Sequence, residues 1–393
     1  MKRRSFCRYT ALGSACFAGV VGKDFASAIS SESSPAKSVY EWVVLYWMPY
    51  DNDLWPFGEP IVEMLTRGTR NSATAVVVQS DYWRDSQMRR RQIVNGTTHE
   101  IDITGKDSSD ISTFSTYLDW AYQTFEAQHW AVIVVGHGGK INEISPDDHG
   151  LNLGQKRTWM RVDQFASAVS KFNQATNDRV ELLFFQNCHK ATLEVVYEAR
   201  NCARYTLASQ LILGAPNYYY QGFLHHLQKP SVGGHEAAMA IMNSERADMY
   251  HTLTLVDNQA VKSIPEKLSR VLQPILDSRV PVVRESTFPT YEYFGEQHCD
   301  ALVLLGYLAQ ISGQGKNELT EFAEFLRSSV ITHYKTGGEL YGRHFIRDSD
   351  MEDLCGLSLY LPETERAISH YSALALYEGV DLVNLYRKIL TNN

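Results

Sequence analysis

The sequence predicts an α/β protein whose mostly parallel sheet is flanked by helices on both faces and followed by a largely helical C-terminal part. Continuous apolar, β-branched runs such as residues 131–135 are typical of strands buried on both faces of a parallel sheet. These runs alternate with segments whose apolar residues recur at helical spacing. The 393 residues, 44% of them apolar and 11% aromatic, are enough to build a large core.

The elements are expected in the following order. Strands are predicted at 41–50 and 72–83, a hairpin over 90–104 that turns at Asn95-Gly96, a helix at 112–125, a strand at 131–135, a long polar loop at 140–159, a helix at 162–175, a strand at 179–185, a helix at 191–203 and a strand at 204–210. From about residue 236 onward helices predominate, and "GLSLYLP" (356–362) is a single strand-like segment.

The N-terminus has the features of an export signal. Arg3 and Arg4 precede a weakly apolar, glycine-rich stretch, and Ala26-Ser27-Ala28 offers the small residues at which a signal peptidase cuts. The paired arginines resemble a twin-arginine signal, which predicts the twin-arginine export machinery as a partner and a periplasmic or secreted protein. The alternative is an N-terminal helix of the folded domain, but the apolar run is short and rich in glycine.

The expected organisation is therefore a signal peptide (1–28), a Ser-rich linker (29–39), an α/β domain (40–235) and a mostly helical C-terminal region packed on it (236–393). Removing residues 1–28 takes away five basic residues and one acidic residue, which lowers the formal charge from -8 to -12. The acidic balance and the lack of a basic tract argue against nucleic-acid binding. No later segment has about 18 uninterrupted apolar residues, so no membrane association is expected.

Four cysteines remain in the mature sequence: Cys188, Cys202, Cys299 and Cys355. They are widely spaced and form no C-x-x-C pair, so they do not make a disulfide scaffold. At most one pair among Cys202, Cys299 and Cys355 is open to bridging in an oxidising compartment, and the sequence does not say which.

Two of the most apolar strands end in reactive side chains. "VIVVGHGG" leads to His137 and "LLFFQNCHK" leads to Cys188, and reactive groups of α/β sheets gather at the carboxyl ends of strands. A histidine about 50 residues before a nucleophilic cysteine is also the caspase arrangement, in which the two meet across neighbouring strands. Gly138 allows a backbone N–H to face a developing oxyanion, and we expect Cys188 to start a helix whose dipole lowers the thiol pKa.

Each of these residues alone has a simpler interpretation. A cysteine after an apolar strand is most often an inert core residue, and a lone histidine is most often structural. Their joint position at two strand ends favours catalysis. A metal site built from His137, His149 and Cys188 or His189 lacks a compact ligand spacing, so no metal is expected.

Motifs spread over most of the mature chain resemble the clostripain family of cysteine peptidases, from the clan that includes caspases. They are "YWMPYDNDL" (46–54), "VVVQSD" (76–81), "GHGG" (136–139), "FFQNCHKATLEVVYE" (184–198), "YHTLTLVD" (250–257) and "GLSLYLP" (356–362). The resemblance implies a caspase-like fold, a catalytic dyad of His137 and Cys188, oxyanion donors at the N–H groups of Gly138 and Cys188, and peptide or protein substrates. No third catalytic residue is identified from the motif.

The resemblance also suggests two features that the residues do not establish. The family tends to be clipped into two chains after the histidine, and Lys140, Lys156 and Arg157 are candidate positions. No cofactor is expected, although calcium is compatible with the resemblance.

One departure from the family pattern concerns substrate specificity. The family carries Asp two residues before the cysteine and acidic residues further on, which bind a basic P1 side chain; this chain has Gln186, then Ser209-Gln210, and no Asp or Glu from Ala199 to His235. The expected substrate-binding residues are Gln186, Asn187, Ser209, Gln210 and Tyr218. They predict a P1 preference that is not basic; a P1 Asp is an option, but no arginine partner is identified.

The sequence thus predicts an exported cysteine endopeptidase that works through an acyl-enzyme. The alternative is a catalytically inactive relative that binds peptide or glycan through the same crevice and the tyrosine-rich segment 217–223. A serine hydrolase is disfavoured because the Gly-x-Ser-x-Gly elbow is missing.

Overall fold

A computed structural model describes residues 37–390, except 84, 106, 150–153, 155, 282–289 and 339–353. The expected signal peptide and nearly all of the linker, residues 1–36, lie outside the described residues. Those described belong to one unit of the chain, which begins at Lys37.

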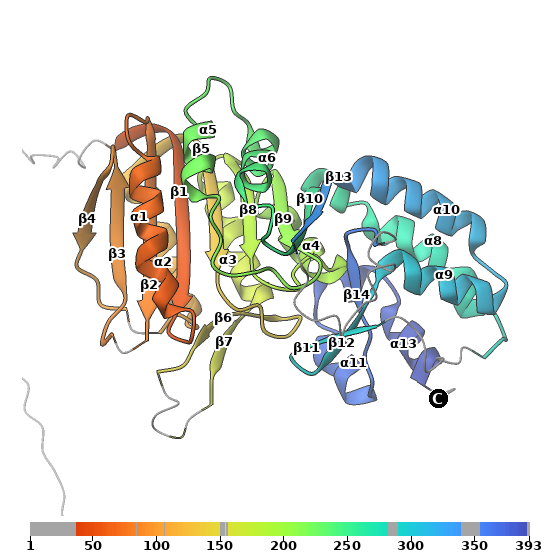
Figure 1. Cartoon of the computed structure of the whole chain (residues 1–393). Coiled ribbons are helices and arrows are strands. Elements are labelled where there is room, and N and C mark those ends of the chain that lie inside the picture. Colours follow the sequence, from red (N-terminus) through yellow and green to blue (C-terminus); the bar gives the residue numbers. More distant parts are fainter. Residues whose placement is uncertain are drawn as a thin grey trace, which may run out of the picture. The chain divides into compact units, whose positions relative to one another are not determined.

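Within the described residues, nine strands form one central sheet (Figure 1). Their order across the sheet is β13 (Ile331–Gly337), β10 (His251–Asp257), β9 (Tyr205–Ser209), β8 (Val180–Gln186), β5 (Phe125–Val135), β1 (Ser38–Tyr50), β2 (Thr74–Tyr82), β3 (Arg89–Val94) and β4 (Thr97–Ile101). The strands from β9 to β2 pair in parallel, whereas the pairs at both edges of the sheet are antiparallel. The predicted fold class is confirmed.

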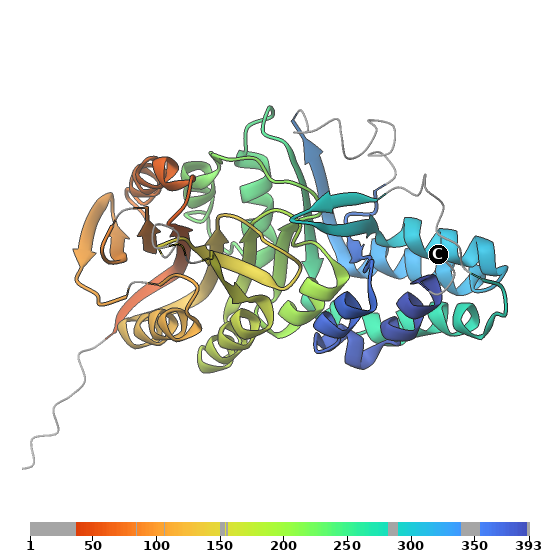
Figure 2. The same cartoon turned by 90° about the horizontal axis from the view of Figure 1, so that it is seen from below.

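Both faces of the sheet are covered, because strand side chains alternate between two cores. In β1, Val43, Leu45 and Trp47 enter one core, whereas Val44 and Tyr46 enter the other. One face packs on α2 (Ile111–Thr124), α3 (Val162–Ala175) and α4 (Leu193–Glu198); the other packs on α1 (Gly58–Gly68), α5 (Tyr220–His226) and α6 (Gly234–Ser244). The two helical layers lie on opposite sides of the sheet in Figure 2.

The C-terminal part is mostly helical, as predicted. It contains α7 (Asn258–Val261), α8 (Ile264–Asp277), α9 (Ala301–Ser312), α10 (Lys316–Phe325), α11 (Glu365–Tyr371), α12 (Ala375–Gly379) and α13 (Leu382–Leu390). Four strands were not anticipated there: β10 and β13, which extend the central sheet, and β11 (Tyr291–Tyr293) and β12 (Glu296–Asp300), which join β14 (Ser358–Tyr360) in a small sheet. Short helical turns complete the chain at Trp55–Phe57, Ala199–Asn201 and Leu326–Val330.

Two local predictions differ from the structure. The expected polar loop at 140–159 contains a hairpin of β6 (Glu143–Asp147) and β7 (Thr158–Arg161). The expected helix at 191–203 is shorter, because Thr192 caps α4 through its side chain and the helix gives way to the turn at Ala199–Asn201. By contrast, the hairpin turn at Asn95-Gly96 is confirmed, and both residues have positive φ.

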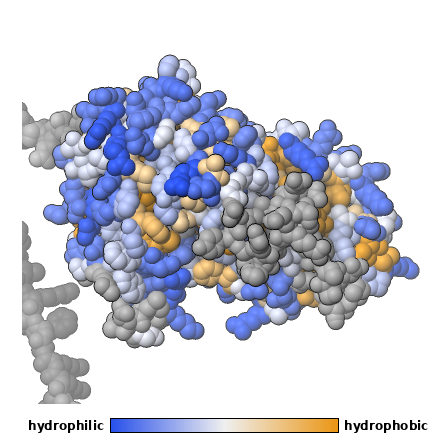
Figure 3. Space-filling view, viewed as in Figure 1, coloured by the Kyte–Doolittle hydropathy of each residue, from blue (hydrophilic) through white to orange (hydrophobic). Residues whose placement is uncertain are grey.

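No helix of the described residues is long and apolar enough to span a membrane. On the face shown in Figure 3, hydrophilic side chains predominate and the hydrophobic areas are separated from one another.

Candidate active site

His137 and Cys188 follow two adjoining parallel strands at the same height. Val135 of β5 pairs with Gln186 of β8. His137 comes two residues after Val135, and Cys188 comes two residues after Gln186. Asn187 fixes the two turns together, because its Nδ2 donates to the carbonyl oxygens of Gly136 at 2.8 Å and His137 at 3.3 Å. The predicted convergence of His137 and Cys188 at one edge of the sheet is therefore what the fold produces.

Gly138 packs directly against the backbone of Cys188. A Cβ atom added to Gly138 would lie 2.2 Å from the Cys188 carbonyl oxygen, far inside contact distance. Only glycine allows the two turns to approach this closely. The backbone N–H groups of Gly138 and Cys188 are thus held in neighbouring turns, as an oxyanion site requires.

His137 and Cys188 line one cavity of about 450 Å³, which we call the Cys188 cavity. Its wall is otherwise apolar or neutral and is formed by Tyr50, Leu54, Phe57, Gly136, Gln186, Ile212, Leu213, Gly214, Ala215, Asn217, Tyr250, Tyr293 and Phe294. Among these described lining residues there is no Asp, Glu, Lys or Arg. The cavity therefore offers a bound side chain apolar contact and neutral hydrogen-bonding groups, but no countercharge for a cation or an anion.

Asp53 is the partner of His137. Its Oδ1 lies 2.8 Å from His137 Nε2, and it comes from the turn after β1, which is the strand next to β5. Partial burial raises the pKa of the Asp53 carboxyl, but the hydrogen bond and charge of His137 outweigh it and the net shift is downward. Asp53 thus holds the imidazole through Nε2, one of its two ring nitrogens.

The surroundings of the Cys188 thiol differ from the prediction. Cys188 lies in the turn after β8, four residues before the N-cap Thr192, so it does not start a helix. Burial raises its pKa, and hydrogen bonding with Leu213 and Tyr293 only partly offsets this effect. Leu213 N–H donates to Sγ at 3.5 Å. The expectation of a thiol pKa lowered by a helix dipole is therefore wrong.

Tyr293, at the end of β11, reaches the same place from the C-terminal part. Its hydroxyl lies beside the Cys188 thiol and the backbone of Gly138, and its ring packs on His189 with centroids 4.2 Å apart. The hydroxyl thus contacts two of the groups expected to act on the scissile carbonyl. Tyr293 and Phe294 close one side of the Cys188 cavity.

Gln186 is held by a network of neutral side chains at the base of the cavity. Its Nε2 donates to Asn217 Oδ1 at 2.7 Å and to Tyr220 Oη at 2.8 Å, and its Oε1 accepts from the Tyr219 hydroxyl at 2.6 Å. Behind Asn217 lies Glu245, whose Oε2 accepts from Asn217 Nδ2 at 3.1 Å. This acid, just beyond the acid-free stretch that ends at His235, does not line the cavity itself.

The remaining expected substrate-binding residues lie elsewhere. Ser209 and Gln210 are fully buried. Ser209 Oγ lies 3.1 Å from Thr252 Oγ1 of the neighbouring strand β10, and Gln210 Nε2 donates to Asp300 Oδ2 of the small sheet at 2.9 Å. Tyr218 is exposed, with Arg246 over its ring. None of the three, nor Asn187, belongs to the cavity wall.

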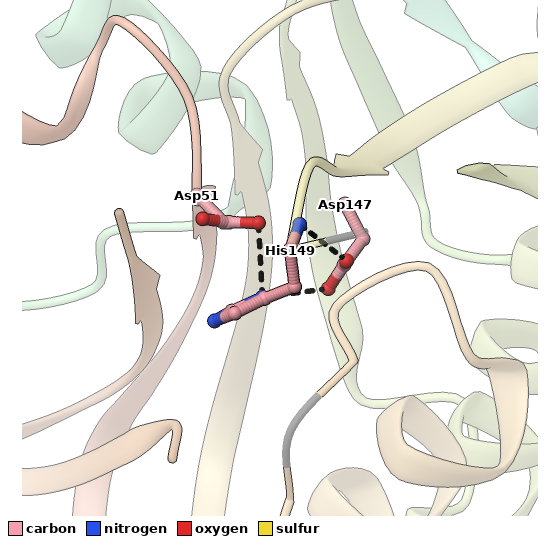
Figure 4. A group of neighbouring side chains, drawn as sticks. All are labelled: Asp51, Asp147 and His149. Atoms are coloured by element: carbon pink, nitrogen blue, oxygen red, sulfur yellow. Dashed lines mark hydrogen bonds and ion pairs between the residues drawn. The ribbon is translucent and has the colours of Figure 1, made fainter. Parts of the chain in front are cut away.

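The other chemistry-bearing residues were placed as follows. Lys140 and Lys156 are exposed, whereas Arg157 pairs with both oxygens of Asp148 at 2.6 Å. Cys188, Cys202 and Cys355 are free thiols. Because two of the three candidates for a disulfide, Cys202 and Cys355, are unbridged, the described residues contain no disulfide between any pair of the three. His149 gathers with Asp51 and Asp147 rather than with His137, Cys188 or His189 (Figure 4).

A model of the clostripain family matches residues 46–380. The chain belongs to this family. It is therefore a cysteine peptidase, and the Cys188 cavity is its candidate active site.

Solved structures agree with this assignment at the level of the fold. A secreted C11 cysteine protease from Bacteroides thetaiotaomicron, in complex with an irreversible peptide inhibitor, aligns with a TM-score of 0.66 and 14% identity over 87% of this chain and 99% of its own. An inactive zymogen C11 protease from Parabacteroides distasonis aligns with a TM-score of 0.63 and 16% identity over 88% and 99% of the two chains. No curated protein matches the sequence.

Two residues of this clostripain-family site escaped the sequence analysis. Asp53 lies within the quoted motif "YWMPYDNDL", and its position after an apolar strand was a usable signal, because β1 and β5 were both expected in one parallel sheet. Tyr293 carries no such signal. It belongs to a hairpin more than 100 residues after Cys188 in the sequence and reaches the site only through tertiary packing.

Proposed function

We propose that this clostripain-family peptidase is an exported endopeptidase in which Cys188 is the nucleophile and His137 is the proton carrier. The observation that carries the proposal is their placement. They follow adjoining parallel strands at the same level of the sheet and line one cavity, and Gly138, the residue after His137, packs on the Cys188 backbone. This is the arrangement that nucleophilic catalysis by a cysteine and a histidine needs.

The reaction would proceed in two steps. Cys188 transfers its thiol proton to His137 as Sγ bonds to the peptide carbonyl carbon; His137 then donates this proton to the amide nitrogen, the C–N bond breaks, and the amine leaves behind a thioester. In the second step water loses a proton to His137 and attacks the thioester. The acid product leaves as the thiol regains its proton. Because burial raises the thiol pKa, this assisted deprotonation is an essential part of the chemistry.

The backbone N–H groups of Gly138 and Cys188 would stabilise the oxyanion. An oxyanion donor is most effective where water is excluded and the donor is held before the charge develops. The close packing of Gly138 on Cys188 and the bracing by Asn187 supply that rigidity.

The P1 side chain would enter the part of the cavity formed by Gln186 and Asn217, and a basic P1 residue would be disfavoured. A buried guanidinium without a carboxylate partner costs several kcal/mol. The described cavity wall provides no carboxylate, and it provides no arginine to pair with a P1 Asp. Uncharged or polar P1 side chains suit Gln186, which offers both a donor and an acceptor.

Export would use the twin-arginine route, which is read from Arg3 and Arg4. Replacing both with lysine should retain the protein in the cytoplasm of a bacterial host. Unchanged export of the double variant would show that another signal is used.

The dyad is tested with a Cys188→Ala variant and the control Cys202→Ala, which removes a buried thiol outside the cavity. Cys188→Ala should lose peptide hydrolysis and labelling by a thiol-directed peptide probe, whereas Cys202→Ala should keep both. Wild-type turnover by Cys188→Ala would exclude this nucleophile. A wild-type chain that binds peptides but neither cleaves them nor reacts with the probe would identify the inactive binding relative.

A further inference from the structure

A second cluster of reactive side chains lies apart from Cys188, at the ends of β1, β2 and β6. Asp51, Asp147 and His149 bring one possible ligand atom each within 4.8 Å of one another and are drawn in Figure 4. Asp81 lies beside His149 and is the fourth member of the cluster. His149 Nδ1 lies 2.9 Å from Asp51 Oδ2, 3.3 Å from Asp147 Oδ2 and 3.9 Å from Asp81 Oδ2. The three carboxylates thus converge on one imidazole nitrogen.

The carboxylates of this cluster are buried, and the groups around them supply too few hydrogen bonds and too little positive charge. The side chain of Asp81 is 0% exposed, and among the described residues neither of its oxygens, nor Oδ1 of Asp51, has a hydrogen bond. The nearby Ser108 hydroxyl donates instead to the carbonyl oxygen of Pro146 at 2.8 Å. Even a charged His149 would leave three carboxylates with one cation. Such an excess of buried negative charge is costly unless a further cation enters.

The remaining contacts hold these groups in the way that metal ligands are held. His149 Nε2 lies 2.9 Å from the Asp85 carbonyl oxygen, which places a proton on Nε2 and points Nδ1 toward the carboxylates. Asp51 Oδ2 accepts from Asp148 N–H at 2.7 Å, and Asp147 Oδ2 accepts from Ser108 N–H at 3.1 Å. Asp51, Asp147 and His149 are therefore each oriented by a further hydrogen-bonding partner, whereas Asp81 keeps both oxygens available.

We propose that Asp51, Asp81, Asp147 and His149 bind one divalent transition-metal ion of the Zn²⁺ or Mn²⁺ type. Three carboxylates and one imidazole suit these ions, because carboxylates alone favour Mg²⁺ or Ca²⁺ and the imidazole nitrogen favours a transition metal. Ligand atoms about 2.1 Å from such an ion lie roughly 3.4 Å apart. These four residues are widely spaced in the sequence, because they come from three separate elements, so they form no compact ligand motif.

The ion would tie β1 and β2 to the β6–β7 hairpin. Asp51 stands two residues before Asp53, the partner of His137. The site is nevertheless separate from the cavity wall around Cys188, so its occupancy can be measured without an activity assay.

The test uses the purified chain, stripped with a chelator and then dialysed against Zn²⁺, Mn²⁺, Ca²⁺ or Mg²⁺ one at a time. Bound metal and the melting temperature are measured for the wild type, Asp81→Asn, His149→Gln and the control Asp248→Asn, an exposed aspartate paired with Arg246. We expect one Zn²⁺ or Mn²⁺ per wild-type and control chain, at least tenfold weaker affinity in the two cluster variants, and a metal-dependent rise in melting temperature that these variants lack.

Asp81→Asn also provides a check on folding. It removes a buried charge without changing size, so the metal-free variant should melt at or above the temperature of the metal-free wild type. The proposal is overturned if no metal binds stoichiometrically, or if Ca²⁺ or Mg²⁺ binds in preference to Zn²⁺ and Mn²⁺ and His149→Gln leaves that binding unchanged.

Discussion

At the residue scale, the orientation of the His137 imidazole depends on which ring nitrogen Asp53 binds. Asp53 binds Nε2 at 2.8 Å from an exposed position, where such a pair contributes little to stability. We expect the pair to orient the ring instead, because an imidazole with one nitrogen hydrogen-bonded presents the other nitrogen in a defined direction.

We predict that Asp53→Ala and Asp53→Asn lower kcat about tenfold or more through loss of this orientation, while KM changes little. Steady-state kinetics of the two variants measure both constants. Asp248→Asn, which alters an exposed carboxylate elsewhere, is the control. A rise in KM with unchanged kcat would mean that Asp53 contacts substrate rather than positioning His137.

Gln186 is the residue at which specificity can be changed. Fluorogenic peptides that differ only at P1 should show the wild-type enzyme at least tenfold less efficient with Arg or Lys than with its best uncharged residue. Gln186→Asp should raise the ratio of Arg to uncharged cleavage about tenfold, because a carboxylate then lines the cavity. Gln186→Asn, which shortens the side chain without charge, should not.

Efficient cleavage after Arg by the wild type would contradict the specificity proposal. Glu245 would then be the first acid to examine, since it is one hydrogen bond behind Asn217. Its other contacts, from the backbone N–H groups of Tyr218 and Arg246, already engage both of its oxygens.

At the element scale, the hairpin of β11 and β12 forms one side of the Cys188 cavity. Phe294 and Gly295, the two residues between these strands, both have positive φ. The turn places the Tyr293 hydroxyl against Cys188 and Gly138, where a substrate carbonyl oxygen is expected. If the proposed oxyanion site is correct, we expect the hydroxyl to move away from these groups when a peptide binds.

Tyr293→Phe should raise kcat/KM for short peptides two- to tenfold, which corresponds to about 0.5–1.5 kcal/mol, because the hydroxyl no longer competes with the substrate carbonyl for this place. Tyr122→Phe, at an exposed position on α2, is the matched loss of a hydroxyl and should have no effect. A lower kcat in Tyr293→Phe would instead assign the hydroxyl a supporting role in catalysis.

A comparison of the strands shows which of them the sequence pattern alone can predict. The central strands β1, β2, β5 and β8 were predicted because each carries a continuous apolar run that a doubly covered strand requires. β13 was missed because its sequence, "ITHYKTG", has mixed polarity and, among the described residues, it lies at the edge of the sheet with β10 as its one strand neighbour. Its pairing, like the position of Tyr293, depends on contacts between distant segments.

At the scale of the whole molecule, the small sheet of β11, β12 and β14 joins the C-terminal part to the candidate site, and its core contains buried histidines. His298 of β12 is fully buried among the rings of Tyr291, Tyr360 and His189. Burial, and secondarily the charge of Lys190, lowers the pKa of His298 to about 3. The pKa of His189 is lowered by burial as well, with the charges of His298 and Lys190 acting in the same direction.

These shifts predict that acid destabilises the fold. Above pH 6.5 His298 is neutral in both the folded and the unfolded chain, so it adds no pH dependence there. Between pH 6.5 and 3 only the unfolded chain takes up the proton, which lowers the free energy of unfolding by up to about 1.4 kcal/mol per pH unit. Urea unfolding at pH 7.5 and 5.0 should therefore show His298→Gln losing about 2 kcal/mol less than the wild type on acidification. Only the change in the free energy of unfolding between the two pH values is compared, so the absolute stability of the variant does not matter. An equal loss of this free energy in both proteins would mean that the fold does not keep His298 neutral.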